Sequence, residues 1–371
     1  MVGWSFGIAP VEYTRSIMKL TALFIAALTL PALCSAQSSV PATQSSHDGF
    51  PQPDFTLHDP KFRPEKPRAV LGSDGKGGTT FAVYGGTDMV QVSSLSFSGD
   101  GSLLAVGSLP NTVDLWDITK RKITHSFKGG TQVALSVDGK KLAKDGDGIE
   151  IIDVATGKVE IRIPWDGGTV KQLSFDPPAR RLLVSANGDD DRVFDVSDGK
   201  LQAELKNTQQ ACFSRDGSLI VGGNAKHLIT WSTRDWTKRS DLPNGPEYVV
   251  TIAADVERDL VVVGGPKTAR LLRLSSGEEI AKVGTGYTNF AGFNRSGTLI
   301  FDYPDTGFGV WDVSGKRYCL DPDLGTNVVA LSSDDRWLAI GTGHKSTDVM
   351  IWSLRNILTG CSVPSESAQT K

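Results

Sequence analysis

Few side chains in this sequence have the types and spacing that catalysis or metal binding requires. His125, His227 and His344 stand far apart along the chain. The stretches NGDDDR at 187–192 and KDGDG at 144–148 carry enough carboxylates to attract Ca²⁺, but both occur where a tight hairpin turn needs Asp and Gly. Solvated side chains explain these residues more simply, so we expect no metal and no cofactor.

Short catalytic motifs are also missing. The chain contains no C-x-x-C-H haem attachment, no G-x-S-x-G turn, no H-E-x-x-H and no G-x-x-x-x-G-K phosphate loop. Its formal net charge is −3, and no basic stripe stands out along its 371 residues. Nucleic acid is therefore a poor candidate ligand, because its backbone is bound by clustered positive charge.

The N-terminal region predicts export. Residues 18–36, MKLTALFIAALTLPALCSA, combine a positive start at Lys19, an apolar run too short to span a bilayer and a cleavage site of small residues ending at Ala36. We expect a periplasmic or secreted mature protein without a transmembrane anchor, and residues 1–17 look like a gene-start artefact. A retained anchor helix and a lipid on Cys34 are the alternatives.

Two segments lack the apolar residues that a folded core needs. Residues 37–66 are rich in Ser, Gln and Pro and predict a flexible linker, and residues 361–371 predict a flexible tail. In an oxidising compartment Cys319 and Cys361 are the pair that we expect to form a disulfide. Free buried thiols are the alternative.

Between these segments one pattern recurs seven times. A bulky residue stands near the end of an apolar strand at intervals of 36 to 42 residues. These anchor residues are Trp116, Ile152, Phe194, Trp231, Leu272, Trp311 and Trp352. A fixed period near 40 residues is typical of the four-stranded blades of a β-propeller.

Each unit has the same internal order. An alternating strand leads into an Asp-Gly or Ser-Gly turn, as in LSFSGDGSLLAVGS, and a short apolar strand, the anchor strand and a polar outer strand follow. No sustained helical period occurs after the signal segment. We therefore predict an all-β fold over residues 67–360, a seven-bladed β-propeller of four-stranded antiparallel blades. Residues 79–84 are expected to close the ring as the outer strand of the last blade.

The anchors have structural roles in this interpretation. Burying a bulky side chain between neighbouring blades contributes about 2–3 kcal/mol. The aspartates that follow four of the anchors can accept hydrogen bonds from backbone N–H groups of the next turn. These are Asp117, Asp153, Asp195 and Asp312.

The units resemble WD-repeat β-propeller blades over residues 79–358, in strand order, in the Asp-Gly turns and in the Trp-Asp ending. They lack the Gly-His pair, so the resemblance is to a divergent, bacterial-type, exported member. It implies a non-catalytic scaffold that binds a protein or peptide partner.

The loops between second and third strands should share one face and present the binding residues. The candidates are Asn111, Asp189, Asp190, Asp191, Lys226, His227, Lys267, Tyr303, Asp305, His344 and Lys345. The alternative is a propeller enzyme of the lactonase or quinoprotein-oxidoreductase type, with its site in the central funnel. Three or more ionisable groups converging there within about 4–6 Å, with perturbed pKa values, would favour the enzyme. A smooth funnel of Ser, Ala and Val would favour the scaffold.

Overall fold

The structure is a computed structural model, and it describes part of the chain. The described residues are 50–59, 69–71, 81–83, 91–188, 190–224, 226–243, 248–284, 286–304, 307–321, 326–342 and 347–364. The predicted signal peptide lies outside them. The chain divides into residues 1–45 and 46–371, and every described residue belongs to the second unit.

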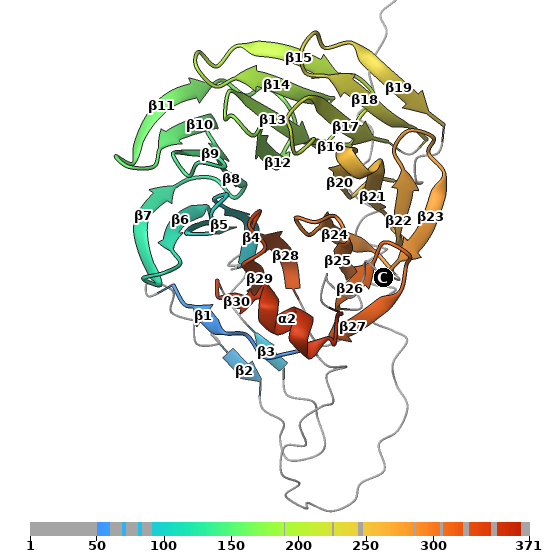
Figure 1. Cartoon of the computed structure of the whole chain (residues 1–371). Helices are drawn as coiled ribbons and strands as arrows, with labels where there is room; N and C mark the ends of the chain where they lie inside the picture. Colours follow the sequence, from blue (N-terminus) through green and yellow to red (C-terminus); the bar gives the residue numbers. More distant parts are fainter. Residues whose placement is uncertain are drawn as a thin grey trace, which may run out of the picture. The chain divides into compact units, whose positions relative to one another are not determined.

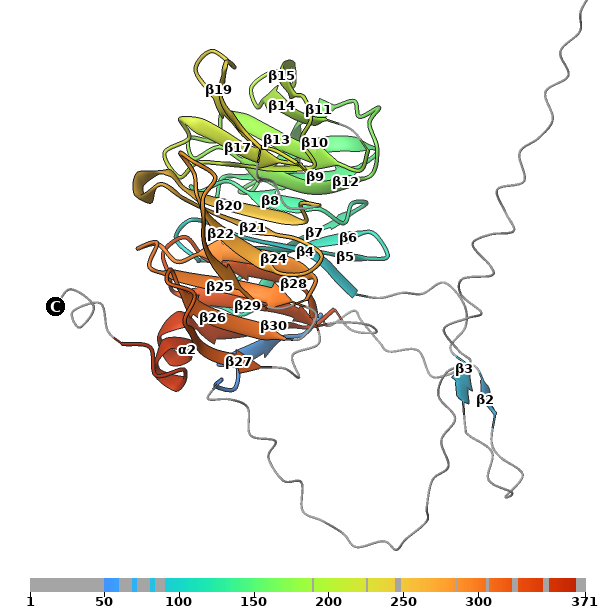
Figure 2. The same cartoon turned by 90° about the vertical axis from the view of Figure 1, so that its right-hand side faces the viewer.

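Seven four-stranded antiparallel sheets are arranged around a central axis (Figure 1). Figure 2 shows the same sheets from the side. The first four blades, each from its inner to its outer strand, are β4 (Gln91–Phe97), β5 (Leu103–Leu109), β6 (Thr112–Asp117) and β7 (Lys122–Lys128); β8 (Val133–Leu135), β9 (Lys141–Gly146), β10 (Gly148–Asp153) and β11 (Lys158–Ile163); β12 (Val170–Phe175), β13 (Arg181–Ala186), β14 (Asp191–Asp195) and β15 (Leu201–Leu205); and β16 (Gln210–Phe213), β17 (Leu219–Gly223), β18 (Leu228–Ser232) and β19 (Lys238–Leu242).

The remaining blades follow the same order. They are β20 (Thr251–Asp255), β21 (Leu260–Gly264), β22 (Ala269–Arg273) and β23 (Glu279–Val283); β24 (Thr288–Phe293), β25 (Leu299–Pro304), β26 (Phe308–Asp312) and β27 (Arg317–Asp321); and β28 (Thr326–Leu331), β29 (Trp337–Thr342), β30 (Val349–Ser353) and β1 (Phe55–Leu57). The predicted seven-bladed propeller is confirmed.

The anchors occupy the same place in every blade. Each pairs with the second residue of the neighbouring strand, as Ile152 does with Leu142 and Leu272 with Val261. Each also packs against the preceding blade: Ile152 shares a buried cluster with Val113 and Leu115 of the first blade. The core of the ring is thus a series of apolar seams between blades, which is where the repeat predicted the anchors to be.

The aspartates that follow the anchors cap the outer turns, as predicted. The Asp117 carboxylate accepts a hydrogen bond from the Lys120 backbone N–H at 2.9 Å, and Asp153 accepts from the Thr156 N–H at 2.8 Å. Asp195 and Asp312 accept from the backbone N–H groups of Ser197 and Ser314.

The predicted closing strand was wrong in its position. β1, at residues 55–57, pairs with β30 and closes the last blade, while β3 (Phe81–Val83) pairs with β2 (Ala69–Leu71). Phe50 and Leu57 are buried, 5% and 2% exposed, so residues 50–57 belong to the folded domain and not to a linker. Closure by an N-terminal strand is confirmed, but it starts about 25 residues earlier than predicted.

The C-terminal end also differs from the prediction. A seven-residue helix, α2 (Leu354–Gly360), follows β30, and Ser353 caps its N-terminus by accepting from the Asn356 N–H. Cys361 is 4% exposed and forms the predicted disulfide with Cys319 of β27, with a Cα–Cα distance of 5.2 Å. Residue 361 is therefore not the start of a flexible tail.

Candidate recognition site at the channel mouth

The turns between inner and second strands share one local design. The first residue of each turn is a small polar residue that is at most 5% exposed. These residues are Ser98, Ser136, Asp176, Ser214, Asp255, Asn294 and Ser332. In six of the seven turns the side-chain oxygen accepts a hydrogen bond from the backbone N–H five residues later, at 2.8–3.0 Å. The turn is thereby fixed, and so is the residue at its second position.

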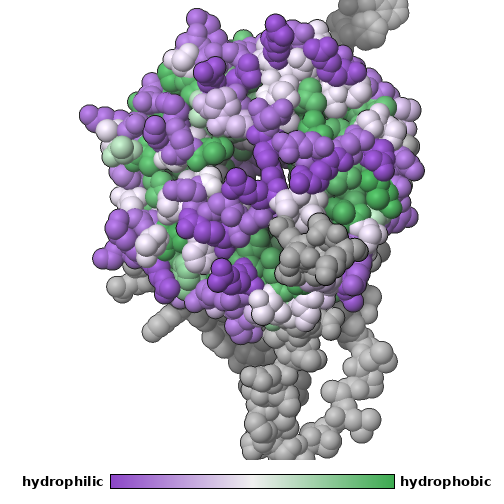
Figure 3. Space-filling model, in the orientation of Figure 1, coloured by the Kyte–Doolittle hydropathy of each residue, from purple (hydrophilic) through white to green (hydrophobic). Residues whose placement is uncertain are grey.

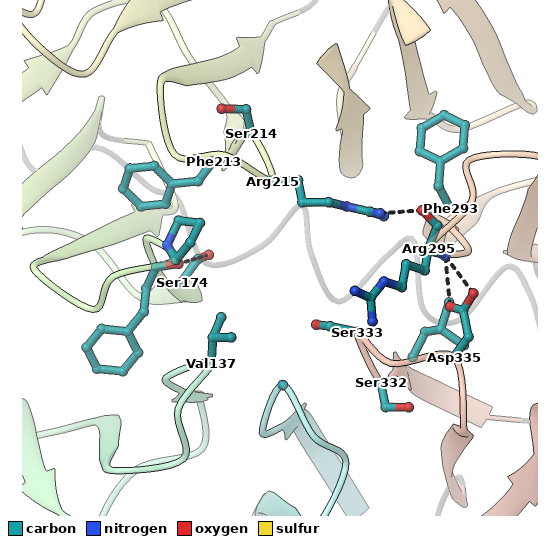
Figure 4. A pocket seen from close by; sticks show the side chains of 14 residues that line it. Val137, Ser174, Phe213, Ser214, Arg215, Phe293, Arg295, Ser332, Ser333 and Asp335 are labelled. Carbon is teal, nitrogen blue, oxygen red and sulfur yellow. Dashed lines mark hydrogen bonds between the residues drawn. The ribbon is translucent and has the colours of Figure 1, made fainter. Parts of the chain in front are cut away.

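The second positions surround a cavity at one end of the central channel. The cavity has a volume of about 440 Å³, and six of the seven blades contribute to its lining. The second-position residues that line it are Gly99, Val137, Pro177, Arg215, Arg295 and Ser333. Figure 4 shows Val137, Arg215, Arg295 and Ser333 around the opening, and Figure 3 shows hydrophilic surface beside it.

Two arginines and one aspartate supply the ionisable groups of this cavity. The Arg215 guanidinium extends from the fourth blade to the sixth, where it donates hydrogen bonds to the carbonyls of Arg295 and, at 3.3 Å, Asn294. The backbone N–H of Arg295 donates to both carboxylate oxygens of Asp335, at 2.8 Å each. These contacts link the turns of three blades (Figure 4).

The Asp335 carboxyl has a perturbed pKa. Burial raises it above its ordinary value, against the opposing effects of the Arg295 backbone hydrogen bond and of the positive charges of Arg215 and Arg295. The funnel therefore holds three ionisable side chains, Arg215, Arg295 and Asp335. It is not the smooth surface of Ser, Ala and Val that we expected for a scaffold.

Apolar side chains and serines form the remainder of the lining. Phe175, Phe213, Phe293 and Leu331 lie at the ends of inner strands. Val137, at the second position of its turn, is 47% exposed, which is high for a β-branched apolar residue. A concave site with apolar walls and a few polar groups is the usual form of a ligand site.

The predicted binding loops lie on the opposite face. Neighbouring strands of a blade are antiparallel, so the loops between second and third strands emerge at the end away from the inner turns. Asn111 occupies such a loop with φ 60°, and Lys226 is exposed in another. His227 contacts the Asp241 carboxylate through Nδ1 at 2.6 Å, and Asp190 pairs with Lys206 at 3.0 Å.

The other predicted loop residues vary in position. Asp191 is fully buried, and burial raises the pKa of its carboxyl to about 6, so it is not a surface group. Lys267 lines a smaller cavity of about 270 Å³ in the fifth blade, beside an Arg270–Glu279 ion pair at 2.5 Å. Tyr303 lies within β25. Asp189, Asp305, His344 and Lys345 lie outside the described residues.

Sequence reasoning missed the channel-mouth residues although their signal is present. The aligned turns SGDG, SVDG, SRDG, NRSG and SSDD place Arg215 and Arg295 at the same position as Gly99 and Val137. From the sequence alone these turns read as hairpin connections, because a variable residue in a turn has no chemical signature until the ring brings equivalent positions together.

In the described part of the chain, no helix is long and apolar enough to cross a membrane. The same residues include no group of three or more His, Cys, Asp or Glu side chains that could hold a metal ion.

Parts of the chain are similar to known proteins. Residues 78–117 match the family model described as "WD domain, G-beta repeat". The chain is 22% identical over 209 residues to transducin beta-like protein 3 of Rattus norvegicus, covering 54% of this chain and 21% of the relative. It is 32% identical over 143 residues to the periodic tryptophan protein 2 homolog of Schizosaccharomyces pombe, covering 38% of this chain and 15% of the relative.

The chain thus spans about a fifth or less of the length of these relatives. The matched repeat contains β4, β5 and β6 of the first blade, where the Trp116-Asp117 pair ends the third strand. The fold is thus a seven-bladed β-propeller, and the chain is similar to WD-repeat proteins over part of its length.

Proposed function

We propose that this protein is a non-catalytic scaffold that binds a protein or peptide partner at the mouth of its central channel. The observation that carries the proposal is the cavity of about 440 Å³, lined by equivalent turn positions from six blades. Hydrogen-bonded turns hold its charged and apolar side chains in place, and preorganised side chains lower the entropy cost of binding. The WD-repeat match supports the same class of function.

Site-specific photo-crosslinking in the producing cell tests this proposal. A photoreactive amino acid at Ser333 samples the channel mouth, one at Lys226 samples the opposite face, and one at Lys122 samples the outer strand β7. We expect a discrete crosslinked protein from position 333 only. A crosslink from position 226 only would move the binding face to the predicted loops, and none from any position would contradict the scaffold.

We also propose that the mature protein acts outside the cytoplasm. The signal-like segment at 18–36 supports this, and so does the Cys319–Cys361 disulfide, because structural disulfides persist in oxidising compartments. Intact mass measurement of the native protein, with and without reduction, tests both points. We expect a chain beginning at Gln37 with a single disulfide. A chain that retains the segment, with all of its thiols free, would contradict export.

The second candidate function is a propeller enzyme. The observation in its favour is the Asp335 carboxyl, whose pKa burial raises and which lies in a cavity with two guanidinium groups, since a carboxyl of raised pKa can act as a general acid or base. Hydrolysis of lactones by the purified protein, lost in Asp335→Asn, would establish the enzyme and overturn the scaffold.

A further inference from the structure

The two arginines of the channel mouth differ in how their donors are used. Two N–H groups of the Arg215 guanidinium are bound to the carbonyls of Asn294 and Arg295. Among the described residues, the Arg295 guanidinium makes no hydrogen bond and no ion pair, while its own backbone is held at both ends by Arg215 and Asp335. Arg295 therefore presents a guanidinium with open donors on a fixed backbone.

Among the described residues, no acidic side chain forms an ion pair with this guanidinium, although its charge acts on the Asp335 carboxyl. Asp335 is the only carboxylate that lines the cavity within the described residues, and both of its oxygens are directed at the Arg295 backbone N–H. With Asp335 ionised, the cavity carries two positive charges and one negative charge. Its electrostatic field favours an anion, and the planar fork of a guanidinium fits a carboxylate in two parallel hydrogen bonds.

The apolar walls of the cavity further restrict the kind of anion that fits. Phe213 and Phe293 lie on the two sides of the opening, and Val137 and Leu331 add aliphatic surface (Figure 4). A small hydrated anion would leave these walls in water, whereas a carboxylate attached to an apolar body would cover them. Burying such surface contributes roughly 25 cal/mol per Å².

We propose that the channel mouth binds a carboxylate carried on an apolar or aromatic body, with Arg295 as its pairing residue. In a protein partner this ligand is an acidic residue flanked by apolar residues. That last step rests on the proposed scaffold function, whereas carboxylate binding itself does not. Ser333, at the equivalent turn position of the neighbouring blade, lies beside Arg295 and can donate a further hydrogen bond.

The direct test uses a pair of small probes. 3-Phenylpropionate and its neutral counterpart 3-phenylpropanamide are titrated into the ¹⁵N-labelled protein, and the Nε–Hε signals of the arginines and the backbone signals of the seven turns are followed. We expect saturable shifts at Arg295 and Ser333 with the acid, and at least tenfold weaker binding of the amide. Equal binding of acid and amide, or no saturable shift, would overturn the proposal.

A charge-matched pair of variants locates the site. Arg295→Gln should weaken phenylpropionate binding at least tenfold. Arg239→Gln removes the same charge from the outer strand β19, where Arg239 contacts Asp235 at 3.4 Å, and should leave binding unchanged. Equal weakening by both variants would show that the acid responds only to overall charge. The acid–amide comparison on the unaltered protein does not depend on how either variant folds.

Peptides then distinguish the two sources of a carboxylate. The probes are a five-residue peptide with blocked ends and a central glutamate between two phenylalanines, its glutamine counterpart, and a blocked-start peptide ending in a free phenylalanine carboxylate. We expect the glutamate peptide to bind at least tenfold more tightly than the other two. Tightest binding of the free C-terminus would overturn the assignment of the carboxylate to an acidic side chain.

The failures of the two proposals are separable. Binding of phenylpropionate without a protein crosslink from any of the three positions leaves the carboxylate site intact and contradicts the scaffold. A crosslinked partner that is retained undiminished by Arg295→Gln supports the scaffold and contradicts the carboxylate site.

Discussion

At the residue scale, one buried carboxyl makes the stability of the fold depend on pH. Asp302 of β25 is fully buried and accepts a hydrogen bond from the Trp311 indole N–H, while its second oxygen has no hydrogen-bond partner among the described residues. Burial raises the pKa of this carboxyl to about 7. Trp311 is one of the repeat anchors, so the pair joins the interblade seam to a group that titrates near neutrality.

Replacing Asp302 by Asn should flatten the stability profile. The folded-state pKa of about 7 lies above the ordinary value of 3.8, so the folded protein binds more protons between these values. The contribution of Asp302 to the free energy of unfolding is therefore complete below about pH 4 and falls as pH rises through 7. Relative to wild type, Asp302→Asn should gain on the order of 2–4 kcal/mol between pH 4 and pH 8 in urea unfolding. The exposed control Asp198→Asn should show no such gain. If the difference in unfolding free energy between Asp302→Asn and wild type were the same at pH 4 and pH 8, the raised pKa of Asp302 would be contradicted.

A second prediction at this scale concerns the buried serines that begin the turns between inner and second strands. Ser214 Oγ accepts from the Leu219 N–H at 2.9 Å and donates to the Asp216 carboxylate at 2.6 Å. Ser214→Ala leaves both partners without this oxygen and should lower the free energy of unfolding by about 1–2 kcal/mol, measured by urea denaturation. Ser197→Ala, in an exposed outer turn, should cost less. Equal costs would mean that the inner turns are not held by their buried first residue.

At the element scale, the disulfide joins the outer strand of the sixth blade to the segment that follows α2. Cys319 lies on the outer strand β27, and Cys361 follows α2, which packs with β30 and the sixth blade in one buried cluster. The link spans 42 residues of sequence. It thus attaches the segment that follows α2 to the sixth blade.

Removing this link should destabilise the protein measurably. In the chain-entropy model a closed loop of this length stabilises by roughly 4 kcal/mol. We therefore expect Cys319→Ser combined with Cys361→Ser to lower the melting temperature by several degrees in calorimetry. Cys212→Ser is the matched control, because Cys212 is a free cysteine of the fourth blade. A reducing agent should lower the melting temperature of the unaltered protein and of the Cys212 variant but not of the double variant. Melting that is the same with and without the link would contradict its structural role.

At the scale of the whole molecule, the period of the sequence predicted the blade number, the strand order and the places of the anchors. The prediction succeeded because each anchor has the same surroundings. Trp116 and Trp231, for example, both pair with the second residue of the neighbouring strand. The closing strand could not be predicted in the same way. FTL at 55–57 is three residues long and lies in a polar, Pro-containing context, and its partner β30 is almost 300 residues away.

The channel mouth was missed for a related reason. Arg215 and Arg295 are 80 residues apart, and only closure of the ring brings the Arg215 guanidinium to the carbonyl of Arg295. A short sequence motif predicts only the structure that it forms locally, such as the turn that Asp117 caps. A site assembled from equivalent positions of different blades becomes visible only after the repeats are superimposed on one another.

Ring closure itself gives the last prediction. Leu57 of β1 is 2% exposed and lies in a buried cluster with Val92 and Leu104 of the first blade and Ile351 of β30. Leu57→Asp places an unpaired charge in this seam and should lower the free energy of unfolding by about 3–5 kcal/mol, or prevent folding. Leu201→Asp is the matched control, because Leu201 also lies on an outer strand but is 49% exposed, and it should cost about 0.5 kcal/mol or less. Urea denaturation followed by tryptophan fluorescence measures both. Equal, small costs would show that the ring is held closed without β1, in which case the pairing of β1 with β30 would not be what makes seven blades one cooperative body.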